Sequence, residues 1–229
     1  YNTALFFLFL PLFLGIYFLL RGQKAKRNWI LCGSIVFYIC SGWDALIIVA
    51  FTAIITYATT RKIEKIYSDF EMQKGQLTAK EQVRLFGTYK KKAKKYFLLA
   101  LAITAAVWIF VKVGRLIGLE EVSTFSEVFT GRGIIVPLGI SYYSLSAIGY
   151  MLDVYWRKAK AEHNVINLFT VMTYFPHIVQ GPISKYSELL EQLKKPPRFE
   201  YTRVCHGLQL MLWGYIKKMV IADRLVLYT

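Results

Sequence analysis

The sequence predicts an all-α, polytopic transmembrane bundle of about six or seven membrane segments, some short or re-entrant, with an amphipathic cytoplasmic arm. Hydrophobic residues make up 55% of the chain and charged residues 19%, whereas soluble domains are roughly 45–50% apolar. The apolar residues gather in uncharged runs without the dyad alternation of a β-barrel, so we expect helices. The uncharged runs are 1–20, 28–43, 45–60, 96–111, 133–152, 164–184 and 204–216.

The first run, residues 1–20, contains no charged side chain. A helix of this length spans about 30 Å, the thickness of the hydrocarbon core of a bilayer. A cleaved signal peptide is the alternative, but no basic region precedes the run and no A-x-A-like site follows it. Basic residues lie on its C-terminal side, at Arg21, Lys24, Lys26 and Arg27. This asymmetry predicts that the first segment ends in the cytoplasm.

The next two runs are short for full spans. Residues 28–43 and 45–60 are separated by the turn-like sequence "SGWD" at 41–44, so a partly re-entrant hairpin is one interpretation. Residues 61–95 follow with many basic side chains and end in "YKKKAKKYF". Basic residues flanked by tyrosines are typical of a membrane interface, and we expect 61–95 to be a cytoplasmic basic amphipathic segment.

In the second half, residues 96–112 lead outward and 133–152 return to the basic cluster "RKAK" at 157–160. The loop 113–132 has balanced charges, which suits the external side. Residues 164–181 are long enough to span but are interrupted, 185–203 are polar, and 204–222 are again helical in pattern. We expect residues 1–229 to form a single transmembrane domain.

The formal net charge is +15, from 29 basic and 14 acidic residues. A soluble protein of this charge would suggest nucleic-acid binding. Here the charge lies between apolar runs, where it sets membrane orientation and meets anionic headgroups, so we expect no nucleic-acid partner. The three cysteines have no metal or disulfide spacing, and we expect no metal site.

The stretch "MTYFPHIVQGPISKYSEL", 172–189, places helix breakers inside an apolar run. Irregular backbone at membrane depth persists only where protein buries it or where it lines a watery cavity. The stretch is therefore either a helix end at the membrane surface or the wall of a pocket. His177 would then be a general base or an interfacial histidine bonded to a carbonyl.

A second unusual run is "VPLGISYYSLSAIGYMLDVYWRK", 136–158. Its glycines, serines and alanine permit close helix packing, and the serine hydroxyls can bond across helices. Asp153 and Arg157 stand at i,i+4 spacing, which predicts an ion pair at the cytoplasmic end. No phosphate-binding glycine loop, HExxH, CxxC pair or GxSxG is present.

These runs, together with "GLQLMLWGYIKKMVIADR", resemble the membrane-bound O-acyltransferase family. The resemblance is strongest to the bacterial branch with alginate O-acetyltransferases and the D-alanyl transfer protein of teichoic acid synthesis. It covers the N-terminal portion of the family pattern. The matching positions are Pro137, Gly139, Ile140, Ser141, Tyr142, Tyr143, Asp153, Tyr155, Phe175, Pro176, Gly181, Pro182, Ile183, Trp213, Gly214, Lys217 and Lys218.

The resemblance implies a ring of tilted helices around a funnel and the transfer of an acyl group, often acetyl, to a hydroxyl of an exported cell-surface polysaccharide such as alginate. It implies no bound cofactor but a thioester co-substrate, acetyl-CoA or an acyl-carrier protein, reaching the cytoplasmic side. The family's catalytic histidine belongs to an F-W-x-x-W-H-like motif, which we expect C-terminal of Thr229. His177 does not inherit that role, so the catalytic residue is unknown.

From the polar groups and the resemblance together we expect eight residues to line a substrate channel. They are Ser141, Tyr142, Tyr174, Pro176, His177, Gln180, Gly181 and Pro182.

Two other classes remain open. Broken helices are also a transporter or flippase feature, although paired interruptions in repeated halves are not found. A catalytically inactive fragment that binds an acyl-carrier protein is the other alternative, because the basic segment 61–95 suits an acidic cytoplasmic partner. A second membrane, periplasmic or extracellular acyltransferase is a further expected partner, and the expected location is the bacterial cell membrane.

Overall fold

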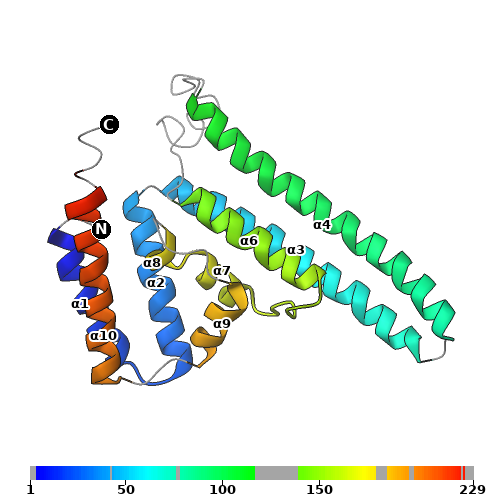
Figure 1. Cartoon of the computed structure of the whole chain (residues 1–229), viewed down its shortest axis with the longest axis horizontal. Helices are drawn as coiled ribbons and strands as arrows, with labels where there is room; N and C mark the ends of the chain where they lie inside the picture. The colour runs from blue at the N-terminus through cyan, green and yellow to red at the C-terminus, as the bar shows by residue number, and fades with distance from the viewer. Residues whose placement is uncertain are drawn as a thin grey trace. The chain divides into compact units, whose positions relative to one another are not determined.

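The computed structural model describes residues 4–41, 43–75, 78–116, 139–178, 185–195, 199–222 and 224. Every regular element within these residues is a helix (Figure 1), which confirms the all-α prediction. The chain divides into two compact units, one formed by residues 21–195 and the other by residues 1–20 and 196–229. Each unit is described separately below.

The larger unit is built on a pair of long helices, α3 (Trp43–Lys74) and α4 (Ala79–Leu116). Figure 1 shows α4 running back along α3, and the contacts between these two helices are the most extensive in the chain. Thr78 precedes α4, and Glu81 Oε2 accepts from the Thr78 backbone N–H at 2.9 Å and from its hydroxyl at 2.6 Å. A glutamate at the third helix position that accepts from the N–H of the capping residue is one half of a capping box.

Within the described residues, α3 and α4 are the two helices long and apolar enough to cross a membrane, over Leu46–Lys74 and Ala79–Val111. A shorter apolar helical stretch covers Leu8–Leu19. The predicted run 45–60 and the start of the predicted arm 61–95 form one continuous helix, because nothing between them breaks the backbone pattern.

Helix α6 (Ile140–Tyr155) packs along α3 and also contacts α4, and small and hydroxyl-bearing side chains are buried on α3 and α6. Ala53 and Thr56 of α3 and Ser144 and Ala147 of α6 are all buried. Thr56 donates its hydroxyl to the carbonyl of Thr52 at 2.8 Å, so the buried hydroxyl has a partner within its own helix. Small residues let helix backbones approach closely where lipid provides no hydrophobic driving force.

Four further helices complete the larger unit: α2 (Gln23–Ser41), α7 (Val165–Met172), α8 (Phe175–Ile178) and α9 (Tyr186–Lys194). Asn164 caps α7, because its side-chain oxygen accepts from the N–H of Ile166 at 2.9 Å. Helix α8 docks on α2 through Phe175, whose N–H donates to Ser34 Oγ at 3.3 Å. Phe175 is also fully buried against Phe37, with ring centroids 5.9 Å apart.

The smaller unit contains α1 (Ala4–Leu19) and α10 (Tyr201–Ile216), which continues into the π-helix η1 (Lys217–Ala222). Phe18 and Phe199 meet edge to face with centroids 5.2 Å apart. The change from α to π geometry falls within the predicted "WGYIKK" motif. Turns of π-helix are rare and occur often at functional sites.

Candidate functional site

One face of the second half of α3 carries polar side chains three or four residues apart, which places them on a single helix face. This polar stripe consists of Tyr57, Arg61, Glu64, Ser68 and Glu71. The loop of residues 156–164, between α6 and α7, lies against it. The Tyr57 hydroxyl donates to the carbonyl of His163 at 3.0 Å, and Glu64 Oε1 accepts from the N–H of Ala161 at 3.1 Å. Side chains of the stripe therefore bind backbone groups of the loop at two positions.

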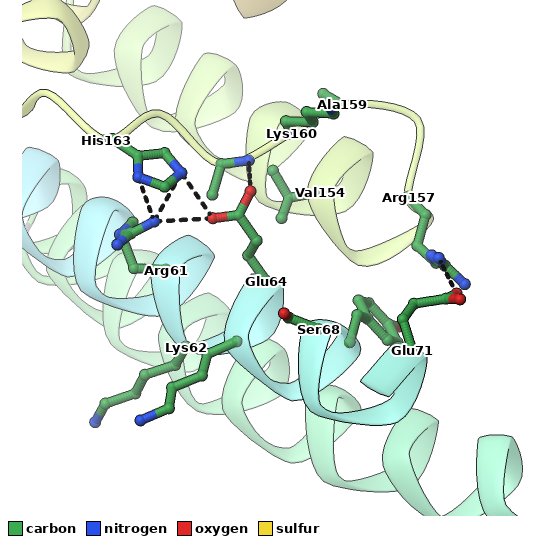
Figure 2. Close-up of a pocket in the computed structure, with 13 residues that line it drawn as sticks. Arg61, Lys62, Glu64, Ser68, Glu71, Val154, Arg157, Ala159, Lys160 and His163 are labelled. Atoms are coloured by element: carbon green, nitrogen blue, oxygen red, sulfur yellow. Dashed lines mark hydrogen bonds and ion pairs between the residues drawn. The ribbon is translucent and has the colours of Figure 1, made fainter. Parts of the chain in front are cut away.

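His163 sits at one end of this contact, between a cation and an anion (Figure 2). Arg61 Nη1 lies 2.8 Å from both ring nitrogens, and Glu64 Oε2 lies 2.9 Å from Arg61 Nη1 and 3.1 Å from His163 Nε2. The guanidinium can only donate, so a ring nitrogen of His163 that bonds to it must accept, and which nitrogen accepts depends on the tautomer.

Arg157 forms the other end of the contact and has an unusual backbone conformation. Its φ is +61°, in the left-handed region. The N–H of Arg157 donates to the carbonyl of Val154 at 3.0 Å, and that of Lys158 donates to the carbonyl of Asp153 at 2.8 Å. These two bonds are the Schellman pattern that ends a helix, in which the left-handed residue is usually glycine. The predicted ion pair of Asp153 with Arg157 does not form, because Arg157 leaves the helix at this cap and its side chain pairs with Glu71 instead.

The side chain of Arg157 leaves the cap and reaches α3. Its Nη2 lies 2.6 Å from Glu71 Oε1, and its guanidinium stands 5.4 Å from the ring centroid of Tyr67. Tyr67 in turn donates its hydroxyl to the carbonyl of Tyr155 at 2.9 Å. The end of α6 is thus attached to α3 by one ion pair, one cation–π contact and one hydrogen bond.

A cleft of about 850 Å³ lies between the polar stripe and the loop. Figure 2 shows the His163 cluster at one end of the cleft and the Arg157–Glu71 pair at the other. Five cationic side chains line it against two carboxylates. The cationic residues are Arg61, Lys62, Lys65, Arg157 and Lys160. Described residues contain no group of three His, Cys, Asp or Glu side chains that could hold a metal ion.

Behind the cleft, Glu162 is the centre of a buried polar network. Its side chain is only 7% exposed, and its Oε2 lies 2.8 Å from Lys194 Nζ of α9. Glu162 Oε1 accepts from the N–H of Asn164 at 3.1 Å and from Asn167 Nδ2 at 3.2 Å. Asn167 Oδ1 in turn accepts from Arg27 Nη1 of α2 at 2.9 Å. The network joins the loop, α7, α9 and α2.

Hydrogen bonding decides the ionisation of Glu162. Burial by itself raises the pKa of this carboxyl, but hydrogen bonds from Lys194, from the N–H of Asn164 and from Asn167 outweigh it. The pKa therefore lies below its ordinary value of 4.5. A buried carboxylate that accepts several hydrogen bonds is favoured in its charged form.

The predicted channel residues of 172–189 lie elsewhere in the larger unit. Tyr174 precedes α8, and its ring meets that of His177 edge to face with centroids 5.0 Å apart. Both side chains are half-buried, while Pro176 is exposed. Helix α7 ends at Met172, as the helix breakers in this stretch predict. Gln180, Gly181 and Pro182 lie outside the described residues.

Ser141 and Tyr142 lie in the first turn of α6, and both are half-buried. Ser141 Oγ accepts from Trp108 Nε1 of α4 at 3.2 Å, a bond across helices of the kind that the serine-rich run predicts. Gly139, before this turn, has a φ of +73°, a conformation that favours glycine. Of the predicted channel residues that the structure describes, none lines the cleft, and the role of all eight in a channel stays a prediction.

The cleft was not predictable from the sequence, because it joins segments that are far apart in the chain. His163 and Arg61 are 102 residues apart, and Arg157 and Glu71 are 86 residues apart. The three- and four-residue spacing of the polar stripe can be seen in the sequence, but nothing in the sequence indicates that the loop 156–164 packs against it.

Comparisons with known proteins show distant homology over nearly the whole chain. It is 26% identical to the "Probable alginate O-acetylase AlgI" of Pseudomonas aeruginosa over 98% of this chain and 40% of that protein. The protein of the same name from Pseudomonas fluorescens is 27% identical over 98% of this chain and 39% of its own length. The "Peptidoglycan O-acetyltransferase" of Helicobacter pylori is 25% identical over 98% and 44% respectively. No protein-family model and no solved structure matches the chain.

These matches confirm the resemblance inferred from the motifs, as distant homology to O-acetyltransferases. The chain spans about two fifths of the length of the curated relatives it matches.

Proposed function

We propose that this chain, a distant homologue of bacterial O-acetyltransferases, is part of a membrane O-acyltransferase that modifies hydroxyl groups of a cell-surface polysaccharide. The observation that carries the proposal is the similarity over 98% of the chain to proteins named for O-acetylation of alginate or of peptidoglycan. Two long apolar helices support a membrane location. Homology to proteins named for alginate and for peptidoglycan supports a cell-surface polysaccharide as the acceptor.

The proposed reaction moves an acyl group, in the first instance acetyl, from a thioester on the cytoplasmic side to a hydroxyl of an exported polymer such as alginate. The donor is acetyl-CoA or an acyl-carrier protein. A general base must take the proton of the attacking hydroxyl, and hydrogen-bond donors must stabilise the oxyanion of the tetrahedral intermediate. We propose a histidine outside the 229 residues as that base, because no histidine of this chain lies in the family's F-W-x-x-W-H-like motif.

In this proposal the chain contributes six or seven membrane segments, some short, to a helical wall in the bacterial cell membrane. The bend between α7 and α8 supports a wall position for Tyr174 and His177, since the backbone is irregular there within an apolar stretch. Gln180, in the same stretch, is the polar residue that we propose to face the acyl-transfer path.

An acidic carrier or another acidic cytoplasmic protein is the proposed partner of the basic segment 61–95. Five lysines, all exposed, crowd the first half of α4 within this segment. They are Lys90, Lys91, Lys92, Lys94 and Lys95. Neutralising all five should weaken carrier binding and flatten its dependence on salt. If the native protein and the variant with all five lysines neutralised bind the carrier equally across a salt series, the carrier is not a partner of this segment. A second membrane or periplasmic acyltransferase would complete the pathway.

The test of the function is deletion of the full-length gene in its own bacterium. Ester-linked acetate released by mild base from cell-surface polysaccharide should fall strongly, and the full-length gene should restore it. Complementation with Tyr174→Ala or Gln180→Ala at equal protein level should restore less. Unchanged ester acetate in the deletion strain would refute the proposed function, whereas full restoration by both variants would refute only the wall position of these residues.

A further inference from the structure

We propose that the cleft between the polar stripe and the α6–α7 loop is a binding site for a phosphate group at the membrane surface. Its volume of about 850 Å³ is within the roughly 300–1,000 Å³ range of small-molecule sites. It begins where the uncharged run 45–60 of α3 gives way to Arg61. A phosphate carried by a molecule at the membrane–water interface would meet the protein at this level.

The charges of the cleft favour an anion. Its two carboxylates already have cationic partners: Glu64 pairs with Arg61 and contacts His163, and Glu71 pairs with Arg157. Two of the cationic side chains, Lys65 and Lys160, have no ion pair within the described part of the chain. The ammonium of Lys62 lies over the ring of Tyr96 on α4, 5.4 Å from its centroid, and Figure 2 shows this side chain extending away from the loop. The other four cationic groups against two paired carboxylates still leave a surplus of positive charge. A phosphate monoester carries about 1.5–2 negative charges at neutral pH and accepts several hydrogen bonds; the phosphodiester of a phospholipid carries about one.

The donors at the two ends of the cleft suit phosphate in particular. Arg61 and Arg157 each give one guanidinium nitrogen to the ion pairs with Glu64 and Glu71. A planar guanidinium has further N–H donors, which can bind phosphate oxygens. Figure 2 places Ser68 between the two arginines on α3, where its exposed hydroxyl adds a donor to the floor of the cleft. Arginine, lysine and serine together form a donor set without a competing free carboxylate.

The backbone conformation of Arg157 also supports a ligand site in the cleft. A non-glycine residue at positive φ is strained, and such residues cluster at ligand sites. Glycine would satisfy the helix cap at this position at lower cost. The arginine side chain at this strained position extends from the cap to Glu71 on the wall of the cleft. The strain is accounted for if the side chain has a role in the cleft.

Two molecules could carry the phosphate: a soluble nucleotide such as coenzyme A, or an anionic phospholipid. Native mass spectrometry of the full-length protein in neutral detergent distinguishes them. The probes are coenzyme A and dihexanoyl phosphatidylglycerol, each added separately, with dihexanoyl phosphatidylcholine as the zwitterionic control. Binding is measured without turnover, so failure here leaves the proposed transfer reaction untouched.

The variant Lys65→Glu/Lys160→Glu reverses the two cleft lysines that have no ion pair. The matched control, Lys94→Glu/Lys158→Glu, makes the same change of charge at two exposed lysines that do not line the cleft. The cleft variant should bind the phosphate probe about tenfold or more weakly than the control, because two attractive charges become repulsive at close range. The milder Lys65→Gln/Lys160→Gln should give an intermediate loss.

Loss of coenzyme A binding alone would identify a nucleotide site, and loss of phosphatidylglycerol binding alone would identify a headgroup site. Equal binding of both probes by the cleft variant and the control, at equal melting temperature, would overturn the proposal. If the charge-reversal variant does not fold, the glutamine pair gives the same comparison.

Discussion

Glu162 shows how much a single side chain can organise in this chain. It is an acidic residue in a basic loop, and nothing in its sequence neighbourhood marks it as buried. In the structure its carboxylate accepts hydrogen bonds from α9, from the start of α7 and from Asn167. A buried charge is tolerated only when it is paired and hydrogen-bonded, and Glu162 meets that condition.

Replacing Glu162 with Gln should destabilise the larger unit by about 1.5–3 kcal/mol, the usual worth of hydrogen bonds to a charged group. Glutamine keeps the size of the side chain but replaces one accepting oxygen with a donor, which then faces Lys194 or the N–H groups. The measurement is the melting temperature of the full-length protein in detergent. Glu188→Gln is the control, since Glu188 is 64% exposed and its ion pair with Lys185 is long at 3.6 Å. Equal melting temperatures for the two variants would contradict the network.

The pKa of Glu162 predicts how that difference depends on pH. Its pKa is lowered in the folded protein from its ordinary value of 4.5. The stabilisation is therefore complete above that ordinary value and is lost as the pH falls through the lower, folded pKa. The gap in melting temperature between the native protein and Glu162→Gln should be constant near neutral pH and shrink below pH 4.5. A gap that widens on acidification would mean that the sign of the shift is wrong.

At the scale of the element, helix α6 shows which parts of a helix the local sequence controls. The small residues of the run 136–158 predict close packing, and α6 does pack on α3 and α4, with Ser144 and Ala147 buried. Its C-terminus follows a different rule. No glycine stands there, yet the backbone adopts the glycine conformation at Arg157.

This cap makes a prediction about substitutions at Arg157. Both Arg157→Gly and Arg157→Ala lose the ion pair with Glu71, but only alanine keeps a side chain in the left-handed region. Arg157→Gly should therefore be the more stable of the two, by about 1 kcal/mol. Thermal unfolding of the full-length variants gives the order.

The neighbouring position supplies the control for this comparison. Lys158 does not have a positive φ. Lys158→Gly should therefore be less stable than Lys158→Ala, because glycine there only increases the conformational freedom of the unfolded chain. The same order at both positions would show that the backbone at Arg157 is not strained.

At the scale of the whole molecule, the orientation of the α3–α4 hairpin tests the membrane topology. The basic segment 61–95 predicts that the turn between α3 and α4 lies in the cytoplasm. The test protein is the full-length chain with every native cysteine changed to Ser, Cys32, Cys40 and Cys205 among them, and one new cysteine at Thr78. This cysteine should react with a membrane-impermeant maleimide only after the cells are permeabilised. Labelling of intact cells would reverse the proposed topology, and with it the side from which a thioester donor arrives.

Composition and the distribution of charge were sufficient to predict helices and a membrane protein, because a spanning segment must satisfy its own backbone within an apolar run. Three motifs were sufficient to indicate the acyltransferase resemblance. The break after Met172 was also predictable, since proline and glycine act locally on the backbone.

Only the tertiary structure brought the polar stripe of α3 against the loop 156–164. Ion pairs such as Arg157 with Glu71 join residues 86 positions apart, and no local propensity relates such residues. The burial of Glu162 and the strain at Arg157 likewise depend on which helices surround them. Helix formation and membrane insertion are set by short stretches of sequence, whereas a binding cleft depends on the packing of distant segments.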